Sequence, residues 1–117
     1  MIAFDMVLGS GTLLAPRQTL WVLGHRRPSP DAEALFRRCG PIWLTYAAAH
    51  AVADRRGTGG DWRALAWLRG AEIATDVVWA RSSPGFTRPG ARLGMYMAGV
   101  GNVAMTLGFG RLARRAG

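Results

Sequence analysis

The sequence predicts an all-α protein, a small integral-membrane antiparallel four-helix bundle with a short interfacial helix in the first loop. Three observations lead to this prediction. Apolar runs of helical length alternate with short loops rich in proline, glycine and arginine. The run Leu93–Gly110 has eighteen residues without a charge, close to the roughly 20 that a helix needs to cross a bilayer. The run Asp61–Ala80 carries its charges on one narrow stripe.

Composition supports a single membrane-embedded domain over residues 1–117, because this length allows one small core. Half of the residues are hydrophobic and only 19% are charged. Among the 16 glycines, Gly9 and Gly11 on the first helix are expected at close helix contacts. On the fourth helix, Gly94 and Ala98 have the spacing of a close contact, and Gly99 and Gly101 widen the same smooth face.

The formal net charge is +8, and all 15 basic residues are arginines. They fall between the apolar runs, and only Arg69 lies inside one. This placement favours helix ends anchored at lipid headgroups. A basic soluble helical protein that binds nucleic acid is the less favoured alternative. Eight arginines are expected on one side of the membrane and six on the other, which is too even to fix an orientation.

The first part of the chain predicts one membrane helix and one interfacial helix. Met1–Ala15 is apolar apart from Asp5 and lacks the basic start of a signal peptide, so we expect it to be retained as the first membrane helix. Arg17–Gly24 is too short to cross a bilayer. Its Trp21 suits an interfacial helix. The prolines and charges of residues 25–30 then predict a loop.

The remaining chain predicts three more membrane helices. Asp31 is placed to cap an amphipathic helix over residues 31–38, whose acids and arginines match the helix dipole. The Gly40-Pro41 step implies a kink or a fresh start for the second membrane helix, which continues to Ala53. A glycine-rich turn, the third helix, a proline- and glycine-rich loop and the fourth helix follow, over residues 54–60, 61–80, 81–92 and 93–110.

The third helix is the centre of the prediction. At about 100° per residue, Arg69, Glu72 and Asp76 lie within a stripe of roughly 60° on an otherwise apolar helix. Such a stripe is costly against lipid, so it should face the interior and pair there. Arg69 and Glu72 are three residues apart and can pair within the helix. Asp76 has no cation on its own helix face, and we expect a partner from another segment, with Arg38 as one candidate.

Two interpretations of this stripe stay open. Glu72 and Asp76 are candidate catalytic residues, because two carboxylates four residues apart can donate and accept a proton. In the alternative, Arg69 and a second arginine such as Arg38 neutralise both acids in a structural polar cluster.

Three further polar side chains are expected near the stripe. Tyr46 and His50 lie at helical spacing on the second helix. His50 is either a proton shuttle or a hydrogen-bonded core residue. Asn102 on the fourth helix is a natural interhelical hydrogen-bond partner for either acid.

The sequence points to no cofactor and no metal. It contains no dinucleotide fingerprint and no zinc-ligand spacing, and the single Cys39 allows no internal disulfide. The expected partners are the lipid bilayer, a lipophilic small molecule, or a second copy or larger membrane complex, and not nucleic acid. Two functions stay open: a membrane protein with a structural or partner-binding polar core, and a small membrane enzyme or binding protein for a lipophilic substrate.

The order of short motifs resembles an uncharacterised family of small actinobacterial four-helix integral membrane proteins. The matching residues are Leu13-Leu14-Ala15-Pro16-Arg17 at the end of the first helix, Leu35-Phe36-Arg37-Arg38-Cys39-Gly40 before the second, and Glu72 and Asp76 on the third. Similar proteins often continue the second motif with Arg-Asp, whereas this chain has Pro41-Ile42. The resemblance implies a multi-pass protein of the bacterial cytoplasmic membrane and implies no activity.

Overall fold

The computed structural model describes all 117 residues and contains helices as its only regular elements. They are α1 (Ile2–Leu14), α2 (Pro16–Val22), α3 (Pro30–Arg37), α4 (Gly40–Arg56), α5 (Gly59–Ser82) and α6 (Pro89–Ala116). The all-α prediction is confirmed. None of the six helices combines the length and the apolar character needed to cross a membrane.

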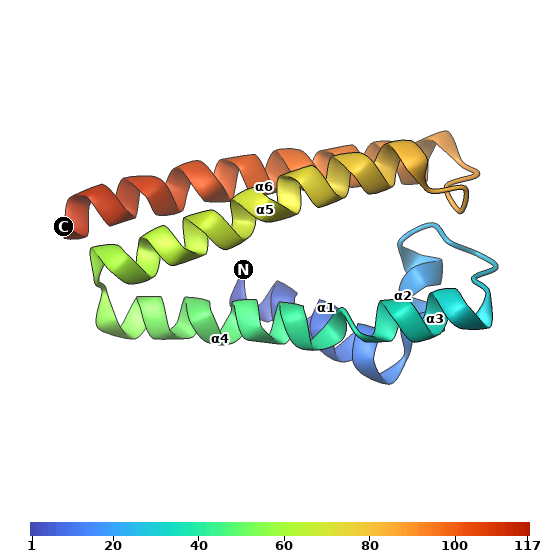
Figure 1. Ribbon diagram of the computed structural model, residues 1–117, viewed down its shortest axis with the longest axis horizontal. Helices are drawn as coiled ribbons and strands as arrows, with labels where there is room; N and C mark the ends of the chain where they lie inside the picture. Colours follow the sequence, from blue (N-terminus) through green and yellow to red (C-terminus); the bar gives the residue numbers. More distant parts are fainter.

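The helices form two layers that lie along the long axis of the molecule (Figure 1). One layer is the hairpin of α5 and α6, and the other pairs α1 with α4. Helices α2 and α3 extend the second layer at one end, which we call the loop end because it carries the loops 23–29 and 83–88. The opposite end carries the α4–α5 turn and the C-terminus, and we call it the turn end.

Local sequence signals set the helix ends. Gly57 has φ 65°, a left-handed conformation that ends α4. The hydroxyl of Thr58 then accepts a hydrogen bond from the backbone N–H of Asp61 at 3.2 Å and starts α5. This short turn reverses the chain and makes α4 and α5 antiparallel.

Ser29, and not Asp31, caps α3. Its hydroxyl accepts a hydrogen bond from the backbone N–H of Ala32 at 3.2 Å. Pro30 occupies the first helical position, which proline favours because its fixed φ is helical and it needs no N–H partner there. Asp31 therefore falls within the first turn, where its charge still complements the helix dipole.

Small residues bring the helices together at specific points. A Cβ added to Gly9 on α1 would lie 2.9 Å from the carbonyl oxygen of Gly40 on α4, so glycine is required at this crossing. The expected contact at Gly94 and Ala98 is wrong: both residues are exposed, and a Cβ on Gly94 would meet nothing within 4 Å. Gly99 instead faces α5, where its Cβ would lie 3.7 Å from Cβ of Asp76.

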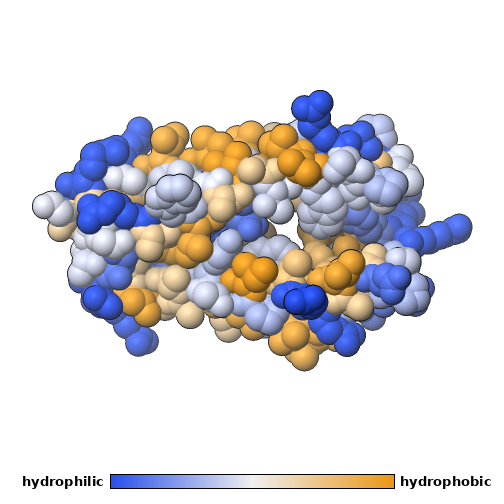
Figure 2. Space-filling view, viewed as in Figure 1, coloured by the Kyte–Doolittle hydropathy of each residue, from blue (hydrophilic) through white to orange (hydrophobic).

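The surface between the two ends is largely apolar. Between Leu93 and Leu107, every exposed side chain of α6 other than Tyr96 is apolar. On α5, Trp67 and Val78 are exposed by 81% and 63%. In Figure 2, hydrophilic residues gather at both ends of the molecule, and most of the hydrophobic patches lie between them, interrupted by a few hydrophilic residues. The surface between the two ends therefore exposes more large apolar side chains than a water-facing surface usually does.

Candidate functional site

Three charged residues in the middle of α5 are turned toward the interior of the molecule. Arg69 and Asp76 are 3% and 7% exposed, and Glu72 is partly buried. We call these three residues the α5 stripe. Together they contact α1, α4 and α6, and the contacts with α1 and α4 join the two layers.

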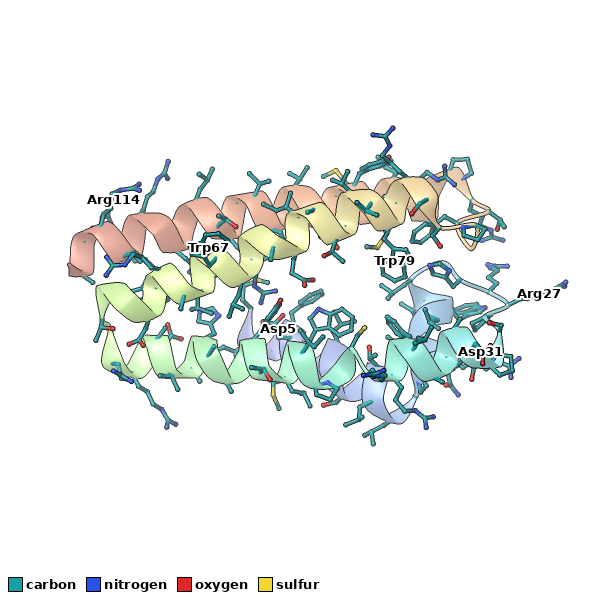
Figure 3. The ribbon with its side chains drawn as sticks, viewed as in Figure 1. Asp5, Arg27, Asp31, Trp67, Trp79 and Arg114 are labelled. Atoms are coloured by element: carbon teal, nitrogen blue, oxygen red, sulfur yellow. The ribbon has the colours of Figure 1, made fainter.

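Arg69 forms an ion pair with Asp5 of α1, through Nη2 and Oδ2. The side chain of Asp5 is completely buried, and Figure 3 shows its position between the layers. The guanidinium carbon of Arg69 also lies 5.1 Å from the ring centroid of Tyr46, within the range of a cation–π contact. The expected pairing of Arg69 with Glu72 within the helix is therefore not the one observed. Arg69 is the only buried arginine, and the buried Asp5 carboxylate has no other cation within reach.

The two acids of the stripe bind neutral donors. The Tyr46 hydroxyl of α4 donates a hydrogen bond to Oε1 of Glu72 at 3.1 Å. The Asn102 amide of α6 donates to Oδ2 of Asp76 at 2.7 Å. The sequence left Asn102 open as a partner of either acid, and in the structure its partner is Asp76. These bonds join α5 to α4 and α6, as the ion pair joins it to α1.

Two of the residues expected near the stripe lie elsewhere. Arg38 is exposed and forms no ion pair, because it lies at the end of α3, before the chain restarts as α4. His50 lies nearer the turn end, edge-on to the rings of Phe109 and Trp62, with centroid distances of 5.1 and 6.1 Å. Its Nε2 is 3.8 Å from a carboxylate oxygen of Asp54, one turn along α4. The structure therefore gives His50 no contact with the acids of the stripe.

Asp5 is the site residue whose role the sequence interpretation missed. It is the only charge in the first apolar run, and a lone acid in such a run is itself a signal that a buried cation must face it. Spacing within one helix favoured Glu72 as the partner of Arg69, while the contact with α1 depends on the tertiary structure.

The observed contacts of the stripe join helices to one another. A cavity of about 860 Å³ lies at the loop end, and neither Glu72 nor Asp76 lines it. No group of three or more His, Cys, Asp or Glu side chains is placed to hold a metal ion. What the cluster can do chemically is hold three helices against α5 through one ion pair and two charge-assisted hydrogen bonds.

Comparison with known proteins identifies no relative, since no protein-family model, curated protein or solved structure matches this chain. The resemblance to small actinobacterial membrane proteins stays a prediction.

Proposed function

We propose that this chain is a small multi-pass integral membrane protein in which the α5 stripe is a structural core. The observation that supports this proposal best is the exposed apolar surface together with the polar cluster in the interior. The buried set includes Asp5, Thr12, Arg69, Asp76 and Asn102, whereas the exposed set includes 21 large hydrophobic side chains. Water would penalise this exterior, and lipid would favour it.

The charged ends fit the same proposal. Eight arginines belong to the loop end and six to the turn end. The molecule extends 46 Å along its long axis, close to the roughly 40–45 Å of a bilayer with its headgroups. Both ends would then lie at the headgroups, where arginine is favourable, and the apolar surface would lie in the hydrocarbon.

Hydroxyl groups on the outer faces are satisfied within their own helices. The side chains of Thr45 and Ser82 donate to the carbonyl oxygens of Pro41 and Val78, four residues earlier, at 2.8 and 2.6 Å. Such local bonds leave few unpaired polar groups on the exterior. A charge on the same surface would cost about 2.5 to 3.5 kcal/mol at mid-membrane.

The alternative of an enzyme or binding protein with Glu72 and Asp76 as acid and base needs a substrate space beside these carboxylates. Their contacts with Tyr46 and Asn102 instead tie them to neighbouring helices. The structural interpretation therefore has the stronger support.

The first test is membrane integration. Expressed without tags, the protein should remain in the membrane pellet after an alkaline wash and should be released by detergent. Val100→Arg places a charge on the exposed face of α6 and should strongly reduce the integrated fraction, because about 2.5 to 3.5 kcal/mol of insertion energy is lost. The matched control is Leu112→Arg, next to Arg111 at the turn end, which should integrate normally. Wild-type protein in the supernatant would refute the proposal and favour a soluble basic protein.

The second test separates a structural Asp76 from a catalytic or ligand-binding one. The Oδ1 atom of Asn102 is buried and makes no hydrogen bond. An amide at position 76 can accept a hydrogen bond from the Asn102 amide and also donate one to that oxygen. We therefore expect the free energy of unfolding of Asp76→Asn to lie within about 1 kcal/mol of the wild-type value. Asp76→Leu leaves the Asn102 amide without its acceptor and should cost about 1–3 kcal/mol.

Both variants and the wild type are then compared by thermal shift in detergent with a panel of lipophilic compounds. Equal shifts in wild type and Asp76→Asn are expected. A compound that stabilises only the wild type would show that the Asp76 carboxylate binds it, and the purely structural proposal would be wrong.

A further inference from the structure

The cavity at the loop end has the size and position of a ligand site. Its volume of about 860 Å³ falls within the roughly 300–1,000 Å³ of small-molecule sites. It lies between the α2–α3 segment and the loop that joins α5 to α6. In Figure 3, Trp79 points from α5 into the space between the two layers. The apolar part of the wall consists mainly of Leu20, Leu35, Phe36 and Trp79.

The charged part of the wall is entirely basic. Arg26 and Arg27 line the cavity, and no acidic residue does. Neither arginine forms an ion pair with a carboxylate of the protein. The guanidinium of Arg26 lies over the Trp21 ring at 5.5 Å, and Arg27 extends away from the bundle at the tip of the loop (Figure 3). Both groups therefore keep their capacity to bind an anion.

The ring of His25 also belongs to this wall. Its ring stacks on Trp79, with centroids 5.1 Å apart, and Nε2 is buried without a hydrogen bond. Burial lowers the pKa of His25 below its usual value, which favours the neutral imidazole. The wall thus combines apolar and aromatic surface with two arginines that form no ion pair.

We infer that this cavity binds one anionic phospholipid, with its phosphate at Arg26 and Arg27 and the upper part of its acyl chains against the apolar wall. The inference rests on the proposed membrane location, which puts the loop end at the level of the headgroups. Arginines at any helix end attract anionic headgroups in general. The cavity adds a specific site, because it limits binding to one lipid at one end of the molecule.

Native mass spectrometry of the purified protein in detergent tests this inference. The probes are dioleoyl phosphatidylglycerol, dioleoyl phosphatidylcholine and inorganic phosphate, each at the same concentration. We expect a one-to-one adduct with phosphatidylglycerol, a much weaker one with phosphatidylcholine and none with free phosphate, which cannot use the apolar wall.

Two variants locate the site. Arg26→Gln combined with Arg27→Gln should reduce the phosphatidylglycerol adduct about tenfold, which corresponds to about 1.4 kcal/mol. Ala32→Phe fills the cavity from α3 without a change of charge and should reduce the adduct similarly, since Ala32 lines it. The matched control is Arg114→Gln combined with Arg115→Gln, which removes the same charge at the turn end and should retain the adduct.

The inference is overturned by equal binding of the two lipids, by several adducts of similar abundance, or by an equal loss in the control variant. Adducts with free phosphate alone would replace the lipid by a simple anion and overturn it too. These outcomes are independent of the membrane-integration test, because the preference is measured in detergent. If the alkaline wash releases the protein from the membrane pellet, the proposed function is wrong. If the protein stays in the pellet but shows no lipid preference, only this inference is wrong.

Discussion

Arg69→Met is expected to lower the free energy of unfolding by about 3–5 kcal/mol, the cost of leaving one partner of a buried ion pair uncompensated. The partner left behind is Asp5, whose side chain is completely buried. The variant also loses the stacking of the guanidinium on Tyr46. Reversible unfolding in mixed detergent micelles, followed by far-UV circular dichroism, gives the difference.

A second change should recover most of this loss. Asp5→Leu in the Arg69→Met background removes the stranded carboxylate, and apolar replacement of a whole buried pair is often neutral or stabilising. The control is Arg17→Met, because Arg17 pairs with Glu33 at 3.6 Å while its own side chain is 70% exposed. Exposed pairs contribute about 0–1 kcal/mol. No recovery in the double variant would mean that Arg69 acts through contacts other than the ion pair.

Helix positions could be predicted from the sequence because they depend on local signals. Prolines, glycines and charged runs separate the apolar segments, and the six helices fall on the six helical segments expected. The predicted boundaries of the helices were less accurate. Helix α6 runs from Pro89 to Ala116, beyond the uncharged run 93–110, because arginines are good helix formers and the charged flanks continue the helix.

Contacts between helices could be predicted only where a polar side chain had few possible partners. Asn102 is one of few polar side chains in the uncharged run 93–110 of α6, and a bond to one of the two acids was expected; the structure gives Asp76 as the partner. Arg69 had several acids to choose from, and burial of Asp5 decided between them. The packing face of α6 was ambiguous because glycines and alanines lie all around this helix. Spacing favoured a broad face with Gly94, Gly99 and Gly101, and of these three glycines the structure brings Gly99 to α5.

The crossing of α1 and α4 should be intolerant of even one added methyl group. A Cβ on Gly40 would lie 2.8 Å from the carbonyl oxygen of Gly9 and 3.0 Å from the backbone nitrogen of Leu13. Backbone atoms of a helix cannot rotate aside, so α1 must move as a unit. We expect Gly40→Ala to cost about 1–3 kcal/mol, as overpacking usually does.

The matched control is Gly101→Ala on α6, where a Cβ would meet nothing within 4 Å. It should stabilise the protein by roughly 0.5–1 kcal/mol, because alanine favours the helix more than glycine does.

A double-mutant cycle links the crossing to the α5 stripe. Helix α1 also carries Asp5, one turn before Gly9, so displacement of α1 should already weaken the ion pair between Asp5 and Arg69. Gly40→Ala and Arg69→Met together should therefore cost less than the sum of the two single variants. Strict additivity would show that α1 keeps its place at Arg69 and absorbs the added methyl group elsewhere.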